Sequence, residues 1–364
     1  MSAGGTQVLD SARSIARELP VIIGGGGPAG TATALGLKRA GEAVHVFEAR
    51  GVDPTRARNI FLRPQAREIL RDIGVGDPGR DTTIMSIEQK LRGLARDEHV
   101  PIDFHHRIVD VAAHDDHVAV TVAGPDDALR TMQGRIFVDA SGGRIAATNE
   151  GALERVPTSR NHVYVTAQYD SPAPFDRVFG AYDRGRDESM FFFPIADDGG
   201  FVAYYDLPPG RTITDEAALL ARYDALAGRL ELGTPVSPPQ AFDAQQHLSR
   251  SAADGRILKI GDSAGNADPY IGAGMAAALV DSRSAVRELT RSGSPEALVG
   301  NAARDVIDGH RHLARDAGLM VRARGLGMRM LPPAHFDERL SRSDLGSSMG
   351  LDFVSRFLTS RPIA

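Results

Sequence analysis

The sequence predicts an α/β fold in which a parallel sheet is interrupted by an antiparallel sheet and is followed by helices. Short apolar segments that end near glycine are typical of buried parallel strands, and they occur at 21–23, 43–47, 136–140 and 257–260. Residues 162–207 instead alternate between apolar and polar positions, as antiparallel strands do. From Pro295 onward the chain has a helical pattern and is rich in arginine.

Local signals place the elements between these segments. After Gly30, small and apolar residues recur at helical spacing until Gly41, which ends the helix. Further helices are expected at 11–19, 64–70, 86–95 and 276–289. Alternation over 109–122 predicts two strands joined by a turn near Asp115. Within the antiparallel sheet, strands are expected at 162–169, 177–183, 189–195 and 201–206.

Composition limits the classes of protein to which the chain can belong. With 42% hydrophobic residues and a formal charge of -5, it can form a sizeable core but lacks the basic balance that nucleic-acid binding usually requires. Cysteine is absent, which excludes disulfides, thiolate metal sites and the redox dithiol of disulfide reductases. No apolar run spans a membrane and no signal-peptide pattern precedes the first strand, so a cytoplasmic location without membrane contact is expected.

The decisive motif lies between the first strand and the first helix. Gly25, Gly27 and Gly30 form G-x-G-x-x-G in the strand-to-helix context that the motif requires. The glycines permit a tight turn, close approach of a pyrophosphate and close packing of helix on strand, and the helix N-terminus faces the phosphate charge. Glu48 ends the next strand, where it can accept hydrogen bonds from an adenosine ribose. Together these features predict a Rossmann-like dinucleotide-binding unit for NAD or FAD.

A second glycine-bearing turn favours FAD over NAD. Gly261 and Asp262 follow the last buried strand, and a proline and two glycines precede the next helix. Here the chain resembles the class A flavoprotein monooxygenases, the para-hydroxybenzoate hydroxylase family. The resemblance implies non-covalent FAD, with Asp262 on the ribityl chain and with Pro269, Gly272 and Gly274 bordering the isoalloxazine ring. Amide groups at such a helix start can stabilise the negative charge of reduced flavin.

The resemblance extends to segments between the two glycine motifs. Arg58 matches an arginine near the cofactor, and Gln89 takes the place of a glutamine that approaches the flavin chain, with a solvated helix residue as the alternative. The sequence identifies no catalytic acid or base. The expected cofactor contacts are Gly25, Gly27, Pro28, Ala29, Gly30, Glu48, Ala49, Arg50, Arg58, Gln89, Gly261, Asp262, Pro269, Gly272, Ala273, Gly274 and Met275.

With 364 residues, the chain has room for a cofactor domain and a substrate module. We expect a discontinuous Rossmann-like FAD-binding domain at 18–75, 98–150 and 252–295, an antiparallel-sheet substrate domain at 76–97 and 151–251, and C-terminal helices at 296–364. Aromatic residues of the antiparallel sheet are candidates for the substrate wall, although each is individually more typical of a core. These are Tyr169, Tyr182, Phe191, Phe193 and Tyr204.

One segment departs from the family pattern. Where the family carries an Asp-Gly motif, this chain has Asp139-Ala140-Ser141-Gly142-Gly143-Arg144, with Ser141 in place of the motif's aspartate. This version is similar to flavin-dependent halogenases and geranylgeranyl reductases. Tryptophan halogenation is not expected, because its motif contains Trp and the chain has none. The source of electrons stays open between NADPH or NADH as a transient reductant and a separate flavin reductase.

The predicted function is FAD-dependent hydroxylation or epoxidation of a small aromatic or olefinic metabolite. A redox-neutral cyclase or isomerase that keeps FAD as a scaffold, a double-bond reductase and a flavin-binding protein without activity are the alternatives. The pairs His105-His106 and His310-x-His312 lack carboxylates in a recognisable ligand arrangement, so they are interpreted as surface histidines and no metal site is predicted.

Overall fold

The computed structural model describes most of the chain between residues 19 and 330. The described ranges are 19–51, 59–62, 64–78, 81–145, 153–155, 163–171, 180–183, 188–194, 200–206, 215–236, 238–243, 247–266, 274–330 and 361–362. Almost all of the helix expected at 11–19 lies outside these ranges.

A six-stranded sheet with the order β17-β18-β9-β1-β2-β5 forms the first layer of the fold. Its strands are parallel except for β17, which pairs antiparallel with β18 at one edge. Both faces of the central strands are covered, which explains their continuous apolar sequences. The strands are β1 (Val21–Gly24), β2 (Val44–Glu48), β5 (Ile102–Phe104), β9 (Ile136–Asp139), β17 (Ala253–Asp254) and β18 (Ile257–Lys259).

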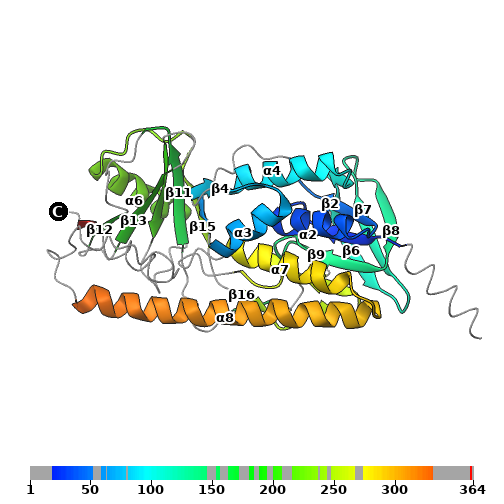
Figure 1. Ribbon diagram of the computed structural model, residues 1–364. Helices are drawn as coiled ribbons and strands as arrows, with labels where there is room; N and C mark the ends of the chain where they lie inside the picture. The colour runs from blue at the N-terminus through cyan, green and yellow to red at the C-terminus, as the bar shows by residue number, and fades with distance from the viewer. Residues whose placement is uncertain are drawn as a thin grey trace, which may run out of the picture.

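Helices pack against one face of this sheet and share its main core (Figure 1). They are α2 (Pro28–Arg39), α3 (Pro64–Ile73), α4 (Ile84–Asp97), α7 (Gly274–Leu289) and α8 (Pro295–Met330). Helix α4 contributes Ile87, Leu91 and Ala95 to this core, because these residues recur once per turn on one face. It therefore packs with the parallel sheet, although residues 76–97 are expected in the substrate domain.

A three-stranded sheet covers the opposite face of the parallel sheet. Side chains of Val118, Val120 and Val122 pack there against Ile22 and Phe137. The sequence predicts two of these strands, whereas the third has few apolar residues and carries no clear alternation. The strands are β6 (Arg107–Ala113), β7 (Val118–Ala123) and β8 (Leu129–Gly134). A separate short ladder joins β3 (Asn59–Phe61) to β4 (Asp81–Thr83).

The second large sheet has the order β15-β11-β14-β13-β12-β19, antiparallel apart from the β12–β19 pair. Its strands are β11 (Val163–Tyr169), β12 (Gly180–Asp183), β13 (Glu188–Pro194), β14 (Phe201–Asp206), β15 (Gln240–Asp243) and β19 (Arg361–Pro362). Strands β10 (Leu153–Arg155) and β16 (His247–Ser249) pair in a two-stranded ladder; in the sequence, β10 precedes β11 and β16 follows β15. The interrupted parallel sheet confirms the predicted fold class.

Helix α6 (Glu216–Arg229), which the sequence analysis does not anticipate, covers one face of the antiparallel sheet. Tyr169 lies in this interface, with its hydroxyl 2.7 Å from that of Tyr223 and its ring stacked on Phe201. Burial raises the pKa of Tyr223, so both hydroxyls stay protonated. Tyr169 is therefore a core residue, which is the interpretation that the sequence favours, and it is not a candidate for the substrate wall. The side chains of Tyr182, Phe191, Phe193 and Tyr204 lie outside the described residues.

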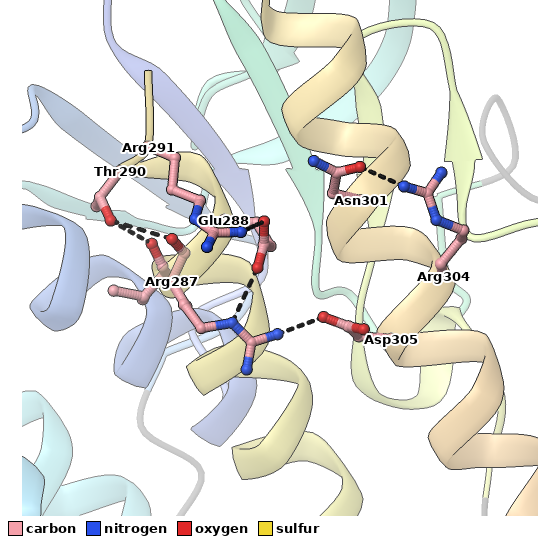
Figure 2. A network of polar contacts seen from close by, with 8 residues as sticks. Arg287, Glu288, Thr290, Arg291, Asn301, Arg304 and Asp305 are labelled. Carbon is pink, nitrogen blue, oxygen red and sulfur yellow. Dashed lines mark hydrogen bonds and ion pairs between the residues drawn. The ribbon is translucent and has the colours of Figure 1, made fainter. Parts of the chain in front are cut away.

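Helices α7 and α8 are held together by polar contacts as well as by apolar packing. Glu288 of α7 is 5% exposed and binds Arg287 and Arg291 at 2.9 Å each, and Arg287 also reaches Asp305 of α8, as Figure 2 shows. In Figure 1, α8 runs along the lower edge from the parallel sheet toward the antiparallel sheet. No helix in the described part of the chain combines the length and the apolar character of a membrane span.

Candidate cofactor site

The first glycine turn connects β1 to α2 in a conformation that only glycine can adopt at two positions. Gly25 has a φ of 111°, and a Cβ there would lie 2.4 Å from the carbonyl oxygen of Ala140. A Cβ on Gly30 would lie 1.9 Å from the oxygen of Gly25. The turn therefore has the tightness and the close helix packing that the motif predicts.

The helix that starts at this turn presents an open N-terminus. Gly27 is the N-cap residue of α2 and makes no side-chain cap hydrogen bond, and Pro28 begins the helix. The first amide groups of a helix have no partner within the helix and carry its positive end. A Cβ on Gly27 would meet a single atom within 4 Å, Glu88 Oε1 at 3.9 Å. These features suit a phosphate group that approaches the backbone.

Glu48 lies at the end of β2, directly beside the glycine turn. It is 4% exposed, and its carboxylate accepts hydrogen bonds from Gly26 N at 2.7 Å and from Arg50 N at 2.9 Å. Each carboxylate oxygen has a second lone pair, so Glu48 can accept a further hydrogen bond from a ribose hydroxyl. Ala49 is exposed, and Arg50 Nη1 is buried without a hydrogen-bond acceptor among the residues described.

The second glycine turn lies against the first. Gly261 begins a short 3-10 helix, η1 (Gly261–Ser263), with a φ of 59°. A Cβ on Gly261 would lie 3.4 Å from the Cβ of Ala29 in α2. Asp262 is exposed and lies next to Gly142, whose added Cβ would be 4.0 Å from that of Asp262. Two segments that are far apart in the sequence thus meet at the carboxyl ends of β1, β9 and β18.

A buried carboxylate joins the second glycine turn to the segment that departs from the family pattern. Asp139 Oδ1 accepts hydrogen bonds from Ser141 N at 2.9 Å, Ser141 Oγ at 2.6 Å and Ser263 Oγ at 2.9 Å. Ser263 Oγ in turn accepts a hydrogen bond from Gly143 N at 2.9 Å. Burial lowers the pKa of Lys259, and the charge of Asp139 opposes that shift. Ser141, which replaces the aspartate of the family's Asp-Gly motif, therefore has a structural role as a hydrogen-bond partner of Asp139.

Comparisons with known proteins agree with this geometry. Residues 18–86 match the family model described as an FAD binding domain. Violacein synthase of Chromobacterium violaceum is 27% identical over 340 residues, which cover 74% of this chain and 77% of the relative. An aromatic hydroxylase from angucycline biosynthesis superposes with a TM-score of 0.71 at 22% identity, over 93% of this chain and 76% of the other. For p-nitrophenol 4-monooxygenase of Pseudomonas putida DLL-E4, the TM-score is 0.70 at 18% identity, over 94% and 98%.

The chain has the fold of the class A flavoprotein monooxygenases. The match at residues 18–86 also confirms the predicted FAD-binding unit around the first glycine turn.

Within this flavoprotein fold, a buried histidine supports the second glycine turn. Asp281 of α7 accepts a hydrogen bond from Gly261 N at 2.9 Å, and the same oxygen, Oδ2, lies 2.9 Å from Nε2 of His310 on α8. Both side chains are 3% exposed, so the interpretation of His310 as a surface histidine is wrong. His310 is buried because it continues the apolar stripe of Val306 and Ile307 on α8.

The other histidines lie nearer the solvent. His105 and His312 are exposed, and His106 is half-buried with Nδ1 2.8 Å from the oxygen of Phe104. Among the described residues, no group of three or more histidine, aspartate or glutamate side chains is arranged as a metal site.

The remaining expected contacts lie on α4, at the start of α7 or outside the described residues. Gln89 lies on α4 with an exposed side chain. Gly274 and Met275 begin α7, where a Cβ on Gly274 would meet no atom within 4 Å. Four expected contacts lie outside the described residues, namely Arg58, Pro269, Gly272 and Ala273.

Sequence reasoning did not assign Arg92, Asp139, Ser263 or His310 a role in this region. Asp139 and Ser263 lie in segments that the sequence singles out, but their hydrogen bond to each other forms only in the folded chain. Arg92 and His310 lie on α4 and α8, which carry no glycine motif, and each contacts a partner from a distant segment. A buried charged residue on an apolar helix face is the signal that could have identified Arg92.

Proposed function

We propose that the chain is an FAD-dependent monooxygenase that adds one oxygen atom to a small aromatic or olefinic metabolite. The observation that carries the proposal is the contact between the two glycine turns, in which Gly261 lies beside Ala29 of α2. One dinucleotide can then bind its diphosphate at the first turn and its flavin half at the second. The aromatic hydroxylase and the p-nitrophenol monooxygenase that share the fold support hydroxylation of an aromatic substrate.

The residues of the chain bind and orient the cofactor in this proposal. Bound FAD supplies the electron transfer and oxygen activation that side chains cannot provide. The N-terminus of α2 holds the diphosphate, and Glu48 accepts a ribose hydroxyl. Asp262 accepts a hydrogen bond from the ribityl chain, and the amide groups at the start of α7 offset negative charge on the flavin ring. The antiparallel sheet supplies the wall that orients the substrate and excludes water.

The electron donor is the least constrained part of the proposal. We take NADPH or NADH as a transient reductant, with a separate flavin reductase as the alternative. Ser141, Ser263 and Gly143 form hydrogen bonds within the Asp139 network. The network therefore gives no support for a second nucleotide site at this segment. Either donor belongs to the cytoplasm, which is where the proposal places the enzyme.

The test is reduction of the FAD-loaded protein by NADPH or NADH without oxygen, with and without a panel of phenolic and polycyclic aromatic compounds. Isotope-labelled oxygen is then admitted. We expect stoichiometric FAD, reduction that a substrate accelerates, and one labelled oxygen atom in the product. Conversion without oxygen or reductant would instead establish a cyclase or isomerase, and a colourless protein that refuses FAD would end the proposal.

A further inference from the structure

Arg92 reaches the first glycine turn from helix α4. Its Nε and Nη2 atoms donate hydrogen bonds to the carbonyl oxygen of Gly26 at 3.3 and 3.2 Å. The side chain is only 10% exposed, and its guanidinium lies 5.2 Å from the centre of the Phe104 ring. Arg92 is therefore held in a fixed position beside the loop by contacts on one edge and one face.

The third nitrogen of this guanidinium has no acceptor in the part of the chain that the structure describes. Nη1 is buried and makes no hydrogen bond with any residue that the structure describes. Leaving a charged donor in this state costs more free energy than a typical hydrogen bond contributes, and native proteins rarely do so. Because Gly26 occupies the Nε–Nη2 edge, Nη1 is available to an acceptor that comes from outside the loop.

The local charge identifies the kind of acceptor. Glu88 Oε2 lies 3.7 Å from Arg92 Nη2, and Glu88 Oε1 lies 3.9 Å from the position that a Cβ on Gly27 would take. A carboxylate so near the phosphate approach would repel a diphosphate if no positive charge offset it. Arg92 provides that charge, and its planar donors match phosphate oxygens better than they match a neutral sugar hydroxyl.

We propose that Arg92 Nη1 binds an oxygen of the FAD diphosphate. The inference rests on the proposed function, since it needs FAD in the glycine turns. It adds a cofactor contact that lies outside both glycine motifs. In this proposal the residue of α4 that contacts FAD is Arg92, in place of the exposed Gln89.

Calorimetric titration of Arg92→Met with adenosine, AMP, ADP and FAD tests the proposal. The matched control is Arg96→Met, because Arg96 lies one turn further along α4 and is 83% exposed. We expect Arg92→Met to weaken ADP and FAD binding by about 10- to 100-fold and to change adenosine binding by less than about twofold. Arg96→Met should bind all four ligands as the wild type does. If Arg92→Met fails to fold, Arg92→Lys keeps the charge but loses the planar fork of donors, and ADP binding should weaken by about tenfold.

Three outcomes would overturn the inference. Unchanged ADP and FAD affinity in Arg92→Met would show that Nη1 makes no phosphate contact. Equal losses for adenosine and ADP would show that Arg92 only shapes the loop. Recovery of wild-type ADP binding in the double variant Arg92→Met, Glu88→Gln would show that Arg92 only neutralises Glu88. All three leave FAD binding by the wild type intact, whereas a wild type that binds neither ADP nor FAD refutes the proposed function as well.

Discussion

Gly30 and Gly93 are both helical glycines, yet their surroundings predict opposite effects of the same substitution. A Cβ on Gly30 would lie 1.9 Å from the oxygen of Gly25, whereas a Cβ on Gly93 would meet no atom within 4 Å. Gly30→Ala should therefore lower the free energy of unfolding by about 2 kcal/mol or more and abolish FAD binding. Gly93→Ala should raise it by about 0.5–1 kcal/mol, because alanine is the better helix former.

Urea unfolding followed by circular dichroism measures both effects. Gly300→Ala in α8 is a second control, because its Cβ would also meet open space. Equal stability of Gly30→Ala and the wild type would show that α2 and β1 can separate without loss, contrary to the geometry of the turn.

At this scale, the site residues that the sequence predicts are those whose role is a backbone conformation. Gly25, Gly30 and Gly261 stand where a positive φ or a close contact excludes a side chain, and short motifs encode such positions. Asp139 and His310 could not be predicted in this way. Their partners, Ser263 and Asp281, come from other segments and meet them only in the folded chain.

At the scale of elements, Glu288 binds Arg287, the residue of α7 that also contacts Asp305 of α8, and the Glu288 carboxyl gives this arrangement a dependence on pH. The hydrogen bond from Arg287 lowers the pKa of the Glu288 carboxyl from its ordinary value of 4.5, and Arg291 adds to the effect (Figure 2). A carboxyl whose pKa is depressed by folding stabilises the protein above the pKa of the unfolded chain. That stability is lost as the pH falls through the lower pKa of the folded chain.

We therefore expect Glu288→Gln to lower the free energy of unfolding by about 1–2 kcal/mol at neutral pH. The difference from the wild type should shrink as the pH falls well below 4.5, where Glu288 is protonated in both states. Asp308→Asn is the control, since this carboxylate of α8 is 67% exposed and should contribute little. Urea unfolding across the acid range measures the difference, and a difference that does not vary with pH would contradict the assignment.

Elements were predictable where the sequence carries a strong period. The strands expected at 162–169 and 201–206 are found as β11 and β14, because one face of each is buried. Helix α6 was missed although its sequence carries helix signals, since Asp215 caps its first turn and Leu219, Tyr223 and Leu226 recur at helical spacing. Strand β8 was missed because most of its residues are exposed, so its sequence shows no alternation of apolar and polar residues. It is a strand because it pairs with β7.

At the scale of the whole molecule, the fold brings together two half-sites that lie more than two hundred residues apart in the sequence. Gly27 belongs to the diphosphate half and Asp262 to the flavin half, and the two come together where β1, β9 and β18 end side by side. A ligand that spans both halves gains affinity from the high local concentration of its second part. FAD should therefore bind much more tightly than either ADP or FMN does.

Crossed substitutions separate the two halves. Gly27→Ala is compatible with the φ of -75° at Gly27 and would place its Cβ 3.9 Å from Glu88 Oε1, so the ligand-free protein should keep its stability. The same Cβ stands where the phosphate approaches, and ADP binding should weaken by about tenfold or more while binding of riboflavin, which has no phosphate, stays unchanged. Asp262→Ala should weaken riboflavin binding by about three- to tenfold and leave ADP binding unchanged. Both variants should weaken FAD binding in titration calorimetry, and if each impaired ADP and riboflavin alike, the two turns would not be separate halves of one site.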